Sequence, residues 1–303
     1  MALVQPITPH LWFDTEAREA ATFYTSVFAD SRIDSVTRLR NTPSGDCDVV
    51  AFTLAGQPFM AISAGPLFEA NPSVSFFVNF DPSRDRQARE HLDALWKALS
   101  DGGKVLMPLQ AYPFSECYGW VQDRYGVSWQ VILTDPKGEP RPVIIPSLMF
   151  TGGVVGKAEA AGKFYRSVFD DSREGQLVKY PEGSSPDKPG SVMFSDFRLG
   201  PTWFAAMDSA HAHGFAFNEA ISFLVVCRDQ AELDRHWAKL SAVPESEQCG
   251  WCKDKFGLSW QISPKVLGDV MTSGDQAAID RVTQAFLPMK KLDVAKIEAA
   301  ARG

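Results

Sequence analysis

The chain has 303 residues and a formal net charge of −7, with 45% hydrophobic and 22% charged residues. This composition is typical of a globular protein, and the length suits two domains of roughly 150 residues each. The acidic balance argues against nonspecific nucleic-acid binding, which needs a basic surface. No apolar run approaches the ~18 residues of a membrane span, and no basic-then-apolar leader begins at Met1, so we expect a cytoplasmic protein without a membrane partner.

The sequence pattern of residues 7–63 predicts one strand, one helix and then three strands. Residues 7–13 form a short apolar strand, and the helix at 16–28 repeats its apolar residues at the 3.6-residue spacing of one helix face. Strands follow at 33–39, 49–54 and 58–63. The order then recurs, with a strand at 74–80, a helix at 84–99 and strands at 105–109, 117–122 and 127–133. Residues 1–135 therefore hold two β-α-β-β-β units.

A proline-rich stretch separates this part from a second copy. Residues 136–142 have the composition of a linker. Beyond it the pattern restarts, and Lys-Phe-Tyr-Arg-Ser-Val-Phe at 163–169 matches Thr-Phe-Tyr-Thr-Ser-Val-Phe at 22–28. We expect a first domain at 1–135, the linker, a second domain at 143–266 and a C-terminal helical extension at 267–303. Short helices are predicted in that extension at 275–286 and 293–301.

One hairpin sequence occurs twice. Tyr-Gly-Trp-Val-Gln-Asp-Arg-Tyr-Gly-Val-Ser-Trp-Gln-Val at 118–131 returns at 249–262 as Cys-Gly-Trp-Cys-Lys-Asp-Lys-Phe-Gly-Leu-Ser-Trp-Gln-Ile. Each copy predicts a strand, a tight turn and a second strand, with Gly126 or Gly257 at the positive φ that closes the turn. Two copies of one hairpin indicate two copies of one domain.

Four such units in two halves resemble the vicinal oxygen chelate superfamily of glyoxalases, bleomycin-resistance proteins and extradiol dioxygenases. The strings Ile-Thr-Pro-His-Leu-Trp-Phe-Asp at 7–14, Gly-Gln-Pro-Phe-Met at 56–60 and Asn-Glu-Ala-Ile-Ser-Phe at 218–223 are similar to its PhnB-like branch. The resemblance implies an α+β fold, in which paired βαβββ modules form curved mixed sheets around a cleft. Members are often single halves that dimerise, so we expect a monomeric pseudo-dimer or a homodimer.

The resemblance also implies where a metal would bind. Enzymes of the superfamily hold a divalent metal with His, Glu or Gln from the first and last strands of each unit. The corresponding positions are Thr8, Met60, Ser75 and Gln130 in the first half, and Ile145, Phe204, Ser222 and Gln261 in the second. A first-row metal prefers imidazole, carboxylate or thiolate ligands. We therefore predict no metal and no cofactor.

Strand alternation groups the candidate ligand contacts. Ser128, Gln130 and Ile132 share one face of their strand, while Val127, Trp129 and Val131 share the other. The same rule turns Thr8, His10 and Trp12 toward the cleft. The predicted ligand-binding residues are Thr8, His10, Trp12, Met60, Ser75, Trp120, Gln130 and Gln261. The alternative for Gln130 and Gln261 is a polar side chain satisfied by its neighbours. No catalytic residue is assigned.

Two further motifs are interpreted as structural. Cys249 and Cys252 match C-x-x-C, but they lie on a predicted strand, and their counterparts Tyr118 and Val121 have no thiol chemistry. His211 and His213 could begin a metal site, although a surface loop is the simpler interpretation.

These observations favour a protein that binds a small, partly aromatic organic ligand in a metal-free cleft. The alternative is a metal-dependent lyase, isomerase or dioxygenase. Proteins of this branch are often labelled 3-demethylubiquinone-9 3-methyltransferase-like, but a typical methyltransferase has a Gly-rich strand-to-helix loop that the sequence lacks. A third hypothesis, suggested by the bulky Ile145 and Phe204, is that only the first half retains a usable cleft.

Overall fold

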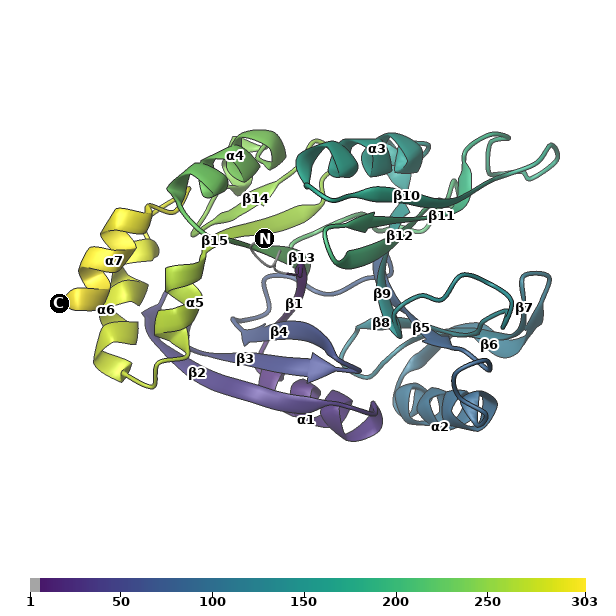
Figure 1. Ribbon diagram of the computed structural model, residues 1–303, viewed down its shortest axis with the longest axis horizontal. Coiled ribbons are helices and arrows are strands. Elements are labelled where there is room, and N and C mark those ends of the chain that lie inside the picture. Colours follow the sequence, from purple (N-terminus) through teal and green to yellow (C-terminus); the bar gives the residue numbers. More distant parts are fainter. Residues whose placement is uncertain (1–5) are drawn as a thin grey trace. The chain divides into compact units, whose positions relative to one another are not determined.

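The computed structural model describes residues 6–303, and these fall into two compact units. Unit 1 combines residues 6–25 and 31–69 with 218–303, and unit 2 combines residues 26–30 with 70–217. Each unit is built on one mixed β-sheet (Figure 1). The expected absence of a leader at Met1 concerns residues 1–5, which lie outside the described residues.

Unit 1 contains the first and fourth modules. The elements of the first module are β1 (Thr8–Phe13), α1 (Ala17–Val27), β2 (Arg32–Thr42), β3 (Gly45–Leu54) and β4 (Gln57–Ser63). Those of the fourth are β13 (Ile221–Cys227), α4 (Gln230–Leu240), the 3₁₀ turn Pro244–Ser246, β14 (Trp251–Lys253) and β15 (Ser259–Pro264). Among the described residues they form a seven-stranded sheet in the order β14-β15-β13-β1-β4-β3-β2. The modules join where β1 runs antiparallel to β13.

Unit 2 contains the second and third modules. The elements of the second are β5 (Val74–Phe80), α2 (Ala88–Ser100), β6 (Lys104–Tyr112), β7 (Ser115–Gln122) and β8 (Ser128–Leu133). Those of the third are β9 (Ile144–Phe150), the 3₁₀ turn Gly152–Val154, α3 (Ala158–Val168), β10 (Arg173–Lys179), β11 (Val192–Leu199) and β12 (Thr202–Asp208). Within the described chain they form an eight-stranded sheet in the order β10-β11-β12-β9-β5-β8-β7-β6, joined through β5 and β9.

The α+β fold with paired modules and mixed sheets is therefore confirmed. The compact units combine modules from both halves of the sequence, so the boundaries predicted at 1–135 and 143–266 mark the repeat along the chain rather than the sheets. The fourth module departs from the predicted order, because the described residues between α4 and β14 form a 3₁₀ turn at Pro244–Ser246 instead of a strand. Pro244 has no backbone N–H to donate to a strand ladder.

The repeated hairpin is held by a buried carboxylate. Asp123 accepts hydrogen bonds from the backbone N of Tyr125 at 2.9 Å and of Val127 at 3.1 Å, and from Trp129 Nε1 at 2.8 Å. In the second copy Asp254 accepts from Phe256 N, Leu258 N and Trp260 Nε1 at 2.8, 3.2 and 2.9 Å. Gly126 and Gly257 have φ of +84° and +87°, as predicted. In both copies the Asp carboxylate thus joins the turn backbone to the tryptophan of the next strand. This structural role explains why the Asp, Gly and Trp residues occur in both hairpins.

The C-terminal extension contains one helix more than the sequence predicted. The helices α6 (Gln276–Phe286) and α7 (Val294–Arg302) are confirmed, and the side chains of Asp275 and Asp293 cap their N-termini. A further helix, α5 (Lys265–Met271), follows β15 directly. None of the helices in the described part of the chain combines the length and apolar character that a membrane crossing requires.

Candidate functional site

One face of the unit 1 sheet is only half-buried. On β4 the half-buried Met60 and Ile62 alternate with the buried Phe59 and Ala61. Phe59 stacks on Phe52, which in turn stacks on Tyr24 of α1, so the helix covers the buried side. We call the opposite, half-buried side the His10 face. Strand alternation places the predicted contacts Thr8, His10, Trp12 and Met60 together on it.

His10 is the buried polar residue of this face. In the strand register it lies between Ser222 of β13 and Met60 of β4. Its side chain is 4% exposed, and Nδ1 has no hydrogen-bond partner among the described residues. Burial lowers the pKa of His10 to about 4, so the imidazole is neutral at neutral pH. A buried polar atom without a partner costs about 1–3 kcal/mol, which a hydrogen-bonding ligand would recover.

An aromatic ring contacts His10, and further rings pack against that ring. The His10 ring lies edge-on to Trp251, with 5.6 Å between ring centroids. Trp12 contacts the same Trp251 ring at 6.1 Å and Phe68 at 5.1 Å, and its Nε1 donates to the Gly65 carbonyl at 2.7 Å. Trp251 was not among the predicted residues. It is the counterpart of Trp120 in the repeated hairpin, and that correspondence could have identified it.

Gln261 of β15 extends the His10 face beyond β13. Its Nε2 donates to Ser222 Oγ at 2.9 Å, and the described hydrogen bonds include none to its Oε1. Gln261 is half-buried, and it pairs in register with Leu224 on one side and Trp251 on the other. Thr8 pairs with Leu224 and belongs to the same row. The face thus offers a free acceptor near a neutral imidazole and two indole rings.

Unit 2 holds the remaining predicted residues in a different environment. Gln130 is 1% exposed; its Oε1 accepts from the Tyr118 hydroxyl at 2.6 Å and its Nε2 donates to Ser75 Oγ at 2.8 Å. Burial raises the pKa of Tyr118, which keeps this donor protonated. Both ends of the Gln130 amide are therefore engaged, which agrees with the alternative of a satisfied polar side chain. Trp120 pairs with Gln130 in register, and its buried Nε1 lacks a partner among the described residues.

Large apolar side chains occupy the corresponding face of unit 2. A buried cluster combines Phe77, Tyr118, Ile145, Trp203 and Ala205, and Trp120 packs against it. The strand registers of the two units superimpose, so that Ser147 takes the place of His10 and Ala205 that of Met60. In that correspondence Phe77, Ile145 and Trp203 replace Leu224, Thr8 and Pro58.

The predicted placement of Phe204 at a ligand position is wrong. Phe204 is fully buried and stacks on Phe197, with 6.0 Å between ring centroids. Phe197 also contacts Tyr165 of α3, so Phe204 lies on the helix side of the sheet. Ala205 holds the ligand position instead, because a shift of one residue along a strand moves the side chain to the opposite face.

The superfamily's metal does not fit these residues. The ligand positions are Thr8, Met60, Ser222 and Gln261 in unit 1, and Ser75, Gln130, Ile145 and Ala205 in unit 2. Hydroxyl, thioether and amide groups are poor ligands for first-row metals, and His10 supplies a single imidazole beside them. Nowhere in residues 6–303 do three or more His, Cys, Asp or Glu side chains gather into a possible ion site.

The surroundings of the C-x-x-C motif and of the two loop histidines do not favour a reactive or metal-binding site. Cys249 and Cys252 are both free thiols, and burial raises the pKa of each, that of Cys252 to about 12. A raised thiol pKa suppresses the reactive thiolate. His211 and His213 lie in a loop, where His213 Nε2 is 2.7 Å from Ser209 Oγ and His211 Nε2 is 3.7 Å from Asp187 Oδ2.

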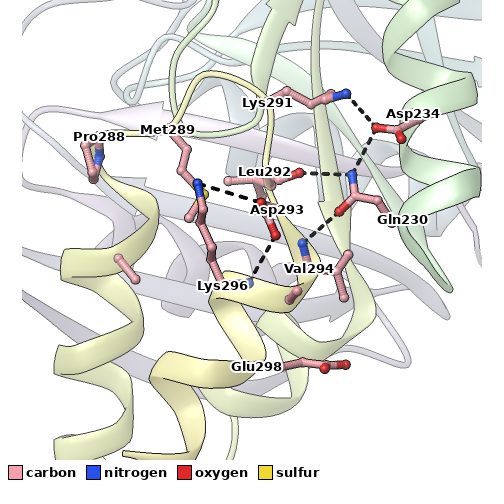
Figure 2. Close-up of a pocket in the computed structure, with 12 residues that line it drawn as sticks. Gln230, Asp234, Pro288, Met289, Lys291, Leu292, Asp293, Val294, Lys296 and Glu298 are labelled. Atoms are coloured by element: carbon pink, nitrogen blue, oxygen red, sulfur yellow. Dashed lines mark hydrogen bonds and ion pairs between the residues drawn. The ribbon is translucent and has the colours of Figure 1, made fainter.

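A surface pocket of about 910 Å³ lies between α4 and the segment that leads into α7 (Figure 2). Its polar side chains bind one another: Gln230 Nε2 donates to Asp234 at 2.9 Å, and Lys291 Nζ is 2.6 Å from the same carboxylate. Gln230 also contacts the backbone at Leu292 and Val294. These contacts fasten the C-terminal extension to α4, and none of the predicted site residues lines the pocket.

Comparison with known proteins gives one family. The model described as 3-demethylubiquinone-9 3-methyltransferase matches residues 5–132 and 142–263. A PhnB protein from Bacillus cereus is 39% identical, covers 43% of this chain and 100% of its own, and has a TM-score of 0.39. A glyoxalase I variant from Zea mays is 10% identical, covers 85% of this chain and 92% of its own, and has a TM-score of 0.50, which is a likeness of fold alone. No curated protein matches the chain.

Proposed function

Because the chain belongs to the 3-demethylubiquinone-9 3-methyltransferase family, in the PhnB-like branch of the vicinal oxygen chelate superfamily, we propose that it binds a small, uncharged, partly aromatic molecule on the His10 face without a metal ion. The observation that carries this proposal is the unpartnered Nδ1 of His10, whose ring contacts Trp251, while Trp12 contacts the same Trp251 ring. Buried polar atoms in folded proteins nearly always have partners, and a ligand would supply one here.

The chemistry of the face favours a neutral ligand. His10 carries no charge at neutral pH, since burial lowers its pKa to about 4. Lys253 follows Trp251 on β14 by two residues, and its Nζ is paired with Glu219 Oε1 at 2.8 Å. An ionised ligand would lose hydration here without gaining a free counter-charge. The tryptophan rings favour an aromatic body, and the Gln261 acceptor favours a hydroxyl or amine on it.

The family's description names a methyltransferase, and we do not propose that activity. S-adenosylmethionine enzymes of the common type bind their cofactor at a Gly-rich turn between a parallel strand and a helix. The sequence has no such turn. Methyl transfer from S-adenosylmethionine to a quinol acceptor remains a direct assay, and turnover that depends on His10 would contradict the binding proposal.

The test is a thermal-shift and calorimetric screen of small aromatic metabolites and drugs, because a ligand of the folded state raises its melting temperature. His10→Phe keeps a ring beside Trp251 but removes the nitrogen. We expect this variant to bind roughly tenfold more weakly, since a hydrogen bond contributes about 0.5–1.5 kcal/mol. Ser147→Ala, at the equivalent position of unit 2, is the matched control and leaves binding unchanged.

Two results would contradict the proposal. One is equal affinity for wild type and His10→Phe, which would place the ligand elsewhere. The other is stoichiometric zinc, nickel, manganese or iron in the purified protein, together with loss of binding after chelation. Binding that survives chelation supports a metal-free site.

A further inference from the structure

The C-terminal helices lie beyond the residues that the family model matches. The family match ends at residue 263, and α5 begins at Lys265. The equivalent point of unit 2 is the end of β8, which is followed by the linker rather than by a helix. Helices α5 and α6 contact strands of unit 1 and are drawn beside them in Figure 1. The extension therefore distinguishes unit 1 from unit 2.

These helices lie on the His10 face. The Thr37 hydroxyl of β2 donates to the Met271 carbonyl at 2.8 Å. Ile279 of α6 forms a buried cluster with Leu39, Cys47 and Ala64, against which Trp12, Val49, Ile62, Val270 and Met271 pack. In the strand register Thr37, Val49, Ile62 and Trp12 form one row across four strands, immediately next to the row that contains His10. The end of α5 thus packs against the same cluster as Trp12, whose row of side chains adjoins the row of His10.

The extension is fastened at several points. Gln276 Nε2 donates to the Arg38 carbonyl at 3.0 Å, and Arg40 is 3.5 Å from Asp280. At the far end Gln230 accepts from Val294 N at 2.8 Å and donates to the Leu292 carbonyl at 3.3 Å (Figure 2). These contacts hold α6 and the segment before α7 against unit 1. Helix α5, which precedes them in the chain, is thereby fixed as a wall of unit 1.

We infer that the end of α5 closes the apolar end of the ligand site on the His10 face, and that Met271 sets the length of ligand that fits. The inference rests on the proposed function. Gln261 and His10 mark the polar end, and Trp12, Ile62, Val270 and Met271 mark the apolar end. The ligand class is therefore a neutral aromatic molecule with a hydrogen-bonding group at one end and a short apolar substituent at the other. Met271 is a specificity-determining residue whose flexible side chain shapes that end.

The experiment uses 4-alkylphenols of increasing chain length as probes, titrated calorimetrically into the full-length protein. For wild type, affinity rises about fourfold for each added methylene until the chain meets the wall, and then falls. Met271→Ala moves the optimum to a longer chain, and Met271→Trp moves it to a shorter one. Met193→Ala changes an exposed methionine of β11 and leaves the optimum in place.

The outcomes separate the two proposals. An optimum that stays the same in Met271→Ala and Met271→Trp, while binding still depends on His10, overturns the inference about α5 alone. If the wild type binds none of the phenols, or binds them equally with His10→Phe, the proposed function fails and the inference fails with it. Melting curves of each variant establish that it is folded, and the two opposite substitutions at one position guard against a general loss of stability.

Discussion

Gln261 in unit 1 is half-buried, whereas its counterpart Gln130 in unit 2 is 1% exposed; His10 and its counterpart Ser147 are both buried, at 4% and 1% exposure. The strands and registers are equivalent, so the difference arises from side chains. Unit 2 fills the space with Phe77, Ile145 and Trp203, whereas unit 1 has smaller residues at those positions. Both units leave buried polar atoms without a partner among the described residues, including His10 Nδ1 in unit 1 and Ser147 Oγ and Trp120 Nε1 in unit 2.

The two units show how one copy of a duplicated fold can pack a sheet face with large side chains while the other has smaller side chains at the same positions. Filling a face with large apolar side chains stabilises a unit, because each buried large side chain contributes about 1.5–3 kcal/mol. A face that must admit a ligand gives up part of that stabilisation. The hypothesis of one structural half therefore takes a new form, since the proposed ligand face combines the first and fourth modules rather than the first half of the sequence.

The largest expected effect concerns what the units share. Removing the buried carboxylate by Asp123→Ala or Asp254→Ala leaves two backbone N–H groups and one indole N–H without an acceptor. We expect each change to lower the free energy of unfolding by about 4 kcal/mol, and to a similar degree in both units. Denaturant titration measures this. Asp→Asn at the same positions keeps an acceptor oxygen and should lose less; an equal loss would show that the hydrogen bonds are not the cause.

The packed face of unit 2 should be more sensitive to truncation than the face of unit 1. Phe77→Ala removes a ring from a buried cluster and is expected to lower the free energy of unfolding by about 3–4 kcal/mol. Leu224→Ala, at the equivalent half-buried position, is expected to lower it by about 1 kcal/mol. Urea unfolding of the two variants tests the contrast, which equal losses would remove.

Acid should destabilise unit 1 through His10. Its pKa is about 4 in the folded state and 6.5 in the unfolded state, so between these values the unfolded chain binds more protons. The contribution of neutral His10 to the free energy of unfolding is therefore fully present above pH 6.5. It is lost as the pH falls toward 4, by about 3 kcal/mol in total. The difference between wild type and His10→Phe, followed by denaturant titration from pH 7.5 to 4, should show this slope. An unchanged difference across that range would show that His10 is not buried as described.

The smallest expected change in the free energy of unfolding concerns the C-terminal helices, which belong to unit 1. Gln230→Ala removes the hydrogen bonds to the chain before α7, which lowers the free energy of unfolding by about 1–2 kcal/mol. Hydrogen exchange should increase in α7 and at its N-terminus while α2 remains protected. If exchange rises evenly in both units, the contact acts on global stability and not on the extension.

Much of the fold could be predicted from the sequence. The repeated hairpin predicted the duplication, and short helices were predicted at 275–286 and 293–301, where α6 and α7 lie. Both predictions succeed because helix formation and hairpin turns depend on residues close together along the chain. The placement of Trp129 opposite Gln130 is confirmed for the same reason. Helix α5 has no cap or long apolar period of its own, and the 3₁₀ turn at Pro244 replaces a strand that the repeat suggested.

The sequence by itself determined the repeated modules and the opposite faces of strands such as Ser128–Leu133, since each follows from residues that are neighbours along the chain. Only the tertiary structure decided which modules share a sheet, and hence that His10 lies beside Ser222 and Trp251 rather than beside Ser75 and Gln130. It also decided which buried polar atoms, such as His10 Nδ1, stay without a partner. These are non-local pairings, and their energies depend on hydrogen bonds and packing between segments that lie far apart in the sequence.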